Sequence, residues 1–131
     1  MQDKDKILIE NWILKSKESL GDTANLINLD MLSSAQNRLY YGLFYLVMAL
    51  AQSKSFITSK HSSLLSWFNR EFIKTEIFPI EMGKLYKTAY DNRQKSDYTI
   101  TFKPDKTALE DSLNKANMFA EKIMKEIKKS L

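Results

Sequence analysis

Apolar residues recur along most of this chain at the three- and four-residue spacing of an α-helix, and they predict about five helices. We expect four helices over residues 5–28, 31–53, 60–74 and 79–95, and a last one that begins at Pro104 or Asp105. The last helix has the most regular stripe: Leu109, Leu113, Ala116, Ala120, Ile123 and Ile127. Segment 98–102 alternates like a strand, but it has no evident partner strand and is expected to form an extended loop.

The predicted helix over residues 31–53 is apolar on two nearly opposite faces. Leucines and small residues form one face, and Tyr41, Tyr45 and Met48 form the other. A helix of this kind is usually buried on both faces, so it is either the centre of a bundle or part of a subunit interface. The expected fold is all-α: a compact up-and-down bundle of about five helices, with a four-helix core, in one domain over residues 1–131.

Two local features qualify the helix predictions. Gly21 lies inside the first predicted helix and weakens it by about 1 kcal/mol relative to alanine, so a break there is conceivable. Thr58 or Ser59 is a plausible N-cap for the third helix, and Asp105 or Thr107 for the last one.

Composition excludes several kinds of chemistry. The chain has no cysteine and a single histidine, His61, so we expect no disulfide, no zinc site and no cofactor. The sequence also lacks a phosphate-binding P-loop, a Gly-x-Gly-x-x-Gly turn and a Gly-x-Ser-x-Gly elbow. No secretory signal is visible, and the apolar run from Leu39 to Ala51 is shorter than the roughly 20 residues of a membrane span. We therefore expect a cytoplasmic protein without a membrane partner.

The formal net charge is +4, which is compatible with an acidic partner such as RNA, although charge alone favours lysines that simply cover the helix surfaces. Arg93 is more informative, because it falls within the apolar stripe of the fourth predicted helix. A guanidinium there needs a partner. It either pairs with Asp97, four residues on, to close the helix end, or lies at a cleft and binds phosphate.

Two further residues are candidates for a binding site. Arg38 shares a helix side with Tyr41 and Tyr45, where it can stack on the rings and hold a phosphate, or simply extend its charge out of an apolar interface. His61 falls in the first turn of the third helix, where it either has a structural role or serves as a general base or phosphate contact.

Three segments together resemble the HEPN family of small helical proteins. The stretch from Ala35 to Phe44 matches the approximate pattern Ala-x-x-Arg-x-Tyr-Tyr-x-x-Phe. The segment that starts at His61 resembles the third helix of the family, and the segment from Arg93 to Tyr98 resembles its Arg-x-x-x-Asp-Tyr element. The order and spacing of these matches extend over nearly the whole chain.

The resemblance implies a helical bundle that forms a homodimer with the two Arg93 ends close together, and that associates with a nucleotide or RNA. It also implies a possible minimal nucleotidyltransferase as partner, in a toxin–antitoxin-like pair. Arg38, Tyr41, His61, Arg93, Asp97 and Tyr98 are then the expected binding residues.

Catalytic members of the family are metal-independent endoribonucleases with a histidine four to six residues after the arginine. Here no histidine follows Arg93 within that distance. We therefore expect a binding or partner version of the fold, with no catalytic residue assigned. Cleavage that uses Arg93 with His61 or Asp97 is the first alternative, and a purely structural adaptor bundle is the second.

Overall fold

The computed structural model describes residues 2–98 and 100–131, apart from the side chains of Asp97 and Tyr98. This part of the chain contains five α-helices, one π-helical turn and no strand, which confirms the predicted all-α class. The elements are α1 (Asp3–Asn28), α2 (Leu32–Ser53), α3 (His61–Phe68), η1 (Asn69–Ile73), α4 (Ile80–Tyr98) and α5 (Lys106–Lys128).

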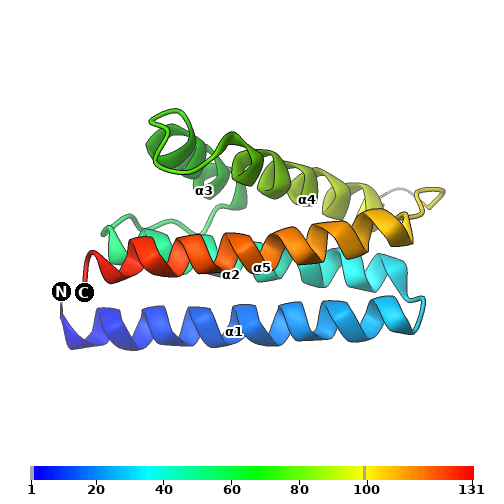
Figure 1. Ribbon diagram of the computed structural model, residues 1–131, viewed down its shortest axis with the longest axis horizontal. Coiled ribbons are helices and arrows are strands. Elements are labelled where there is room, and N and C mark those ends of the chain that lie inside the picture. The colour runs from blue at the N-terminus through cyan, green and yellow to red at the C-terminus, as the bar shows by residue number, and fades with distance from the viewer. Residues whose placement is uncertain (1, 99) are drawn as a thin grey trace.

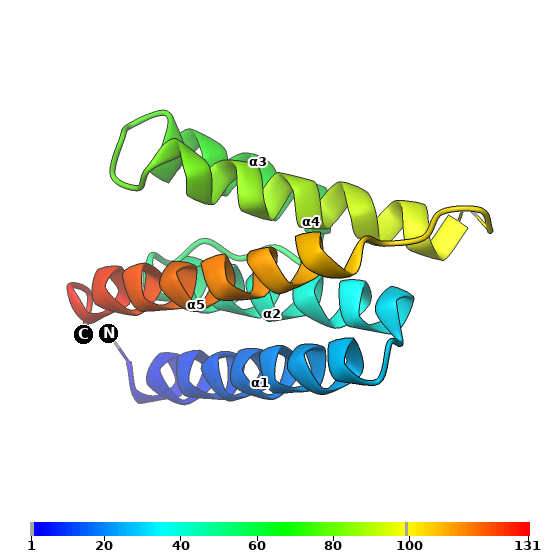
Figure 2. The same ribbon diagram turned by 45° about the vertical axis from the view of Figure 1, so that its right-hand side comes forward.

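Four of the helices run alternately up and down, and the short α3 packs at one end of α4 (Figure 1). The first and last described turns of the chain lie side by side at the same end of the bundle in both views (Figure 2). This arrangement is the four-helix core that the apolar patterns predict. Among the described residues, no helix combines the length and the apolar character that a membrane span requires.

The second helix is the centre of the bundle. It packs against α1, α3, α4 and α5. Its buried residues, among them Leu39, Leu43 and Tyr40, cover most of the helix surface. The remaining side, with Arg38, Tyr41, Tyr45 and Met48, is only partly buried. Of the two interpretations that the sequence left open, the structure therefore supports the buried central helix. The face formed by Tyr41, Tyr45 and Met48 is only partly buried within one chain, so a subunit contact on that face stays a prediction.

Some predicted boundaries and caps need correction. The third predicted helix changes to a π-helical turn at Asn69. At its other end, α3 begins at His61 without a side-chain cap, so the predicted Thr58 or Ser59 cap is wrong. The Thr58 hydroxyl instead accepts a hydrogen bond from the backbone N–H of Lys60. In contrast, the Asp105 carboxylate accepts a 2.9 Å hydrogen bond from the backbone N–H of Ala108, which confirms that cap.

The segment predicted as an extended loop also differs from expectation. Helix α4 continues to Tyr98, beyond the predicted end at residue 95, and residues 100–101 form a turn. The strand-like alternation of residues 98–102 was therefore misleading, because its first residue, Tyr98, belongs to helix α4. Helix α1 is continuous through Gly21, as the helix prediction over residues 5–28 requires, so the break considered there is absent.

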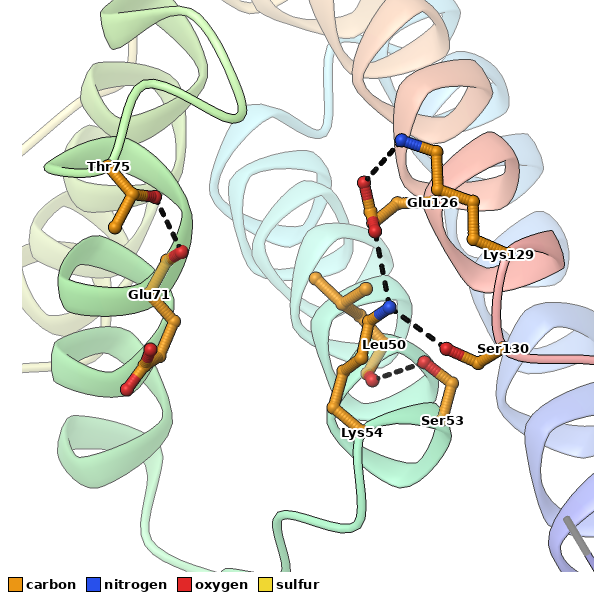
Figure 3. A network of polar contacts seen from close by, with 8 residues as sticks. All are labelled: Leu50, Ser53, Lys54, Glu71, Thr75, Glu126, Lys129 and Ser130. Carbon is orange, nitrogen blue, oxygen red and sulfur yellow. Dashed lines mark hydrogen bonds and ion pairs between the residues drawn. The ribbon is translucent and has the colours of Figure 1, made fainter.

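Polar contacts close the end of the bundle where α2 meets α5 (Figure 3). The Lys54 ammonium donates hydrogen bonds to the Glu126 carboxylate at 3.1 Å and to the Ser130 hydroxyl at 2.9 Å. Burial alone would raise the pKa of Glu126, but the hydrogen bonds from Lys54 and Lys129 lower that pKa below its ordinary value. These contacts fix the C-terminal turn against the central helix.

Helices α1 and α2 approach each other closely at Gly42. The Ser16 hydroxyl donates a 2.7 Å hydrogen bond to the backbone carbonyl of Gly42. A Cβ atom at Gly42 would lie 2.5 Å from Cδ2 and 2.7 Å from Cγ of Leu20, which is too close for carbon atoms. Gly42 therefore has a packing role, and its small size lets the two helices touch.

We expect Gly42→Ala to lower the free energy of unfolding by about 1–3 kcal/mol, because the added methyl group overpacks the α1–α2 contact. Gly21→Ala is the matched control. Nothing lies within 4 Å of a Cβ at Gly21, so this substitution should stabilise α1 by about 1 kcal/mol. Urea unfolding of the two variants measures both effects. Equal stability of the two would contradict the close approach at Gly42.

Candidate functional site

Arg93 lies against two aromatic rings of the central helix. Its stripe on α4 is buried as predicted, with Tyr86 and Ala89 at 0% and 3% exposure, while Arg93 itself is partly exposed. The guanidinium carbon lies 4.8 Å from the ring centre of Tyr40 and 5.8 Å from that of Tyr41. Both distances are within the range of cation–π attraction.

A stacked guanidinium can still bind an anion. Its N–H groups point outward in the plane of the group, whereas the contact with a ring uses its flat face. The fork of N–H donors matches two oxygens of a phosphate or carboxylate. The Nε of Arg93 is buried, so a bidentate contact with phosphate would use the two terminal nitrogens of the guanidinium.

His61, the first residue of α3, belongs to the same cluster. Its Nδ1 lies 2.7 Å from the Tyr40 hydroxyl, and its ring stacks on Phe44 with centres 4.2 Å apart and an interplanar angle of 14°. The Tyr41 ring meets the His61 ring edge-on, with centres 5.9 Å apart. Folding thus brings His61 and Arg93, which are far apart in sequence, into contact with the same two residues, Tyr40 and Tyr41.

The hydrogen bond between Tyr40 and His61 has a defined direction. Burial raises the pKa of Tyr40 well above its ordinary value, only partly offset by the Arg93 charge, so this hydroxyl keeps its proton. Tyr40 is fully buried, and Nδ1 of His61 is the acceptor within reach of its hydroxyl. A buried O–H left without an acceptor is costly, so Tyr40 donates and Nδ1 accepts.

This direction sets the tautomer of His61. Burial lowers the pKa of His61, and the positive charge of Arg93 lowers it further, so the imidazole is neutral near pH 7. With Nδ1 as the acceptor, the ring hydrogen is on Nε2. His61 is partly exposed and therefore presents an N–H donor, which suits contact with a phosphate oxygen.

Arg38 extends the cluster along α2. Its guanidinium carbon lies 5.0 Å from the ring centre of Tyr41, and its Nε and Nη2 both donate to Oδ1 of Asn37. An open polar groove of about 410 Å³ passes beside it, lined by Leu26, Ser33, Ser34, Asn37, Arg38 and Ser96. Arg38 contacts the ring and is also partly exposed, so its role in holding phosphate stays a prediction.

Four of the six predicted binding residues therefore come together around Tyr41: Arg38, Tyr41, His61 and Arg93. The side chains of the other two, Asp97 and Tyr98, lie outside the described residues. We call the residues Arg38, Tyr40, Tyr41, His61 and Arg93 the arginine–tyrosine cluster. Among the described residues, no group of histidine, aspartate and glutamate side chains could hold a metal ion.

Sequence reasoning missed Tyr40, the residue that links Arg93 to His61. Its signal was present, because Tyr40 is the first tyrosine of the Arg-x-Tyr-Tyr pattern. Tyr41 was preferred because it shares a helix side with Arg38. Tyr40 instead points into the bundle, where it contacts Phe44, Tyr86 and Tyr90 as well.

The lowered pKa of His61 predicts a pH-dependent stability. The imidazole of His61 binds a proton less readily in the folded protein than in the unfolded chain. The stability that neutral His61 contributes is therefore complete above the ordinary pKa of 6.5 and declines as pH falls through the folded-state pKa. We expect the free energy of unfolding to decrease on acidification between about pH 7 and 5. The decrease should be smaller in His61→Gln, which cannot titrate. Identical pH profiles for the two proteins in denaturant melts would refute this.

Fold and cluster together define a helical-bundle protein with a basic, aromatic surface site. The HEPN domain model matches residues 9–128, and the chain belongs to the HEPN family.

The relatives cover most of the chain. A "UPF0332 protein" of Thermotoga maritima is 38% identical over 133 residues, which span 99% of this chain and 100% of that protein. "Putative toxin MJ0142" of Methanocaldococcus jannaschii is 37% identical over 117 residues, or 89% of this chain and 80% of that protein. "Putative toxin MJ0605" of the same organism is 28% identical over 123 residues, covering 94% of this chain and 91% of that protein.

Proposed function

We propose that this HEPN protein binds RNA, or a nucleotide, through its phosphate groups at the arginine–tyrosine cluster, as the toxin-type member of a toxin–antitoxin-like pair. The observation that carries this proposal is the placement of Arg93 on the Tyr40 and Tyr41 rings, beside the N–H donor of His61. Arg38 adds a second guanidinium, which lies 5.0 Å from the Tyr41 ring centre and borders a polar groove. Two relatives carry toxin names, which supports the toxin-type role.

The cluster suits single-stranded RNA. Guanidinium groups bind phosphate, and exposed aromatic rings or arginine planes stack on unpaired bases. Tyr41 and Tyr45 are partly exposed and lie next to each other, with ring centres 5.8 Å apart. Tyr98 would add stacking surface and Asp97 would orient Arg93, as the sequence led us to expect.

Fluorescence anisotropy of a labelled single-stranded RNA tests the proposal. Since phosphate contacts dominate, affinity should fall steeply as salt rises. No binding up to about 100 µM protein at low salt would exclude the function, because even non-specific binding usually lies within that limit. A free nucleotide added as competitor separates the two ligand classes.

A second candidate function is metal-independent RNA cleavage. One observation favours it: His61 and Arg93 contact the same two tyrosines, and the Arg93 charge helps to lower the pKa of His61. The tautomer argues for the binding role, because Nε2 carries a hydrogen and cannot accept a proton in that state. RNA incubated with protein in the presence of a metal chelator decides the matter. Cleavage that is lost in Arg93→Ala and His61→Gln would establish the nuclease, and intact RNA would leave binding alone.

We further propose a homodimer, and a minimal nucleotidyltransferase as the antitoxin-type partner. Both follow from the family resemblance. The partly buried side of α2, with Tyr41, Tyr45 and Met48, offers one surface for the dimer contact. Light scattering should give twice the monomer mass at micromolar concentration, and a monomer would contradict the dimer. Copurification of tagged protein with a nucleotidyltransferase encoded by a neighbouring gene tests the partner.

A further inference from the structure

A groove runs between helices α4 and α5. Two adjoining hollows of about 300 Å³ and 200 Å³ form it, and both are lined by Glu81, Leu85 and Lys115. The two helices converge near the loop of residues 102–105 and diverge toward the start of α4 (Figure 1, Figure 2). No residue of the arginine–tyrosine cluster lines either hollow. We call this surface the α4–α5 groove, and it is separate from the proposed phosphate site.

The lining of the larger hollow is mainly apolar, and part of it is exposed. Met82 and Phe119 lie in it at 6% and 1% exposure, whereas Met118 is 62% exposed. Ile80, which follows the lining residue Pro79 in the chain, is 58% exposed. Methionine adapts its shape to a partner and is common at surfaces that bind protein segments. Apolar surface gathered in this way is typical of an interaction site.

The charged residues of the α4–α5 groove are mostly basic. Lys84 lines it from α4, and Lys115 and Lys122 line it from α5, against one acidic lining residue, Glu81. Lys115 pairs with Asp111 at 3.0 Å, but within the described part of the chain Lys84 and Lys122 make no ion pair. An acidic occupant therefore complements the groove. A second copy of this chain, with its net charge of +4, fits less well.

The walls of the groove also decide the form of the occupant. Both walls are helices, whose backbone groups are bonded within each helix, so they offer no free edge with which an extended segment could pair. An amphipathic helix satisfies its own backbone and can bury its apolar face against the groove. Along α5 the lining extends over residues 112–122, about 15 Å or roughly three turns of a bound helix.

We propose that the α4–α5 groove binds a short amphipathic helix of an acidic partner protein. The apolar face of that helix packs on Met82, Met118 and Phe119, and its flanking carboxylates pair with Lys84 and Lys122. This contact does not depend on RNA binding, because it uses none of the residues of the arginine–tyrosine cluster. A bound partner helix would leave Arg93 and His61 accessible.

The probe is a fluorescent synthetic peptide of about 15 residues, long enough to form a helix, with leucines on one face and glutamates on the other. Anisotropy titration with the 131-residue chain should show saturable binding that weakens as salt rises. A control peptide with lysine in place of every glutamate should bind about tenfold more weakly or worse. In methyl NMR, the signals of Met82 and Met118 should shift on binding, whereas that of Met48 on α2 should not.

Two variants with matched controls test the individual residues. Met118→Asp should weaken binding of the acidic peptide about tenfold or more, because it removes apolar contact and adds a like charge. Leu14→Asp, at an equally exposed position on α1 (61% against 62%), should leave binding unchanged. Lys122→Glu should weaken binding roughly threefold to tenfold, whereas Lys6→Glu on α1 should have no effect. All four positions are exposed, so the variants should fold.

Three results would overturn the inference. The first is that the acidic peptide does not bind the wild-type protein. The second is that Met118→Asp binds it as tightly as wild type, or that Met48 shifts in place of Met118, since either would put the contact elsewhere. The third is that Met118→Asp converts a dimer to a monomer in light scattering, which would make a second copy the occupant. Arg93→Ala should bind the peptide as wild type does, so failure here is distinguishable from failure of RNA binding.

Discussion

Replacement of Arg93 by alanine is expected to weaken RNA binding roughly 10- to 100-fold, because hydrogen bonds to a charged group contribute about 1.5–3 kcal/mol. The guanidinium is held 4.8 Å from the Tyr40 ring centre, so little rotamer freedom is lost when phosphate binds. The dependence of affinity on salt should also become less steep, by about one phosphate contact. Anisotropy titrations over a series of salt concentrations measure both quantities.

Two control variants make this result specific to the cluster. Arg70→Ala removes the same charge from η1, at an exposed arginine whose guanidinium pairs with Glu71, and should change affinity little. Arg93→Lys keeps the charge but loses the planar fork, so its affinity should fall between wild type and Arg93→Ala. If Arg70→Ala and Arg93→Ala weaken binding equally, general surface charge rather than the cluster binds RNA.

Replacement of Tyr40 by alanine is expected to have the largest effect on stability, about 3–5 kcal/mol, as for other buried aromatic residues. Tyr40 is fully buried, and its ring contacts aromatic residues of α2, α3 and α4 as well as the Arg93 guanidinium. The loss would leave a cavity at the point where these three helices meet. Guanidinium chloride unfolding measures the change.

Tyr40→Phe separates the hydrogen bond from the packing of the ring. It keeps the ring but leaves Nδ1 of His61 without its donor, so we expect a loss of about 1–3 kcal/mol. Tyr86→Phe is the matched control. The Tyr86 hydroxyl is buried and has no hydrogen-bond partner within the described part of the chain, so its removal should be neutral or stabilising. Equal losses in the two variants would argue against the bond between Tyr40 and His61.

The fold was predictable because each helix carries its own apolar stripe. The two apolar faces of α2 left its place open between the centre of the bundle and a subunit interface, whereas the start of α5 followed from Asp105. The π-helical turn at Asn69 and the extension of α4 to Tyr98 were not predictable from periodicity. Periodicity reports which face is buried, whereas helix ends depend on local hydrogen bonds and on neighbouring elements.

The site was predictable only in part. Arg93 was identifiable because a charge interrupts an apolar stripe. Its proximity to His61 was not, since it depends on how the loop of residues 54–60 places α3 beside α4.

The most direct test of the proposed phosphate site uses the single histidine of the chain. NMR can follow this one imidazole in the free protein and in the RNA-bound protein without assignment ambiguity. In the free protein His61 should titrate below its ordinary pKa of 6.5, because of burial and the Arg93 charge. A phosphate bound beside Arg93 stabilises the imidazolium, so saturating single-stranded RNA should raise the pKa of His61. A His61 titration that is the same with and without bound RNA would contradict the account.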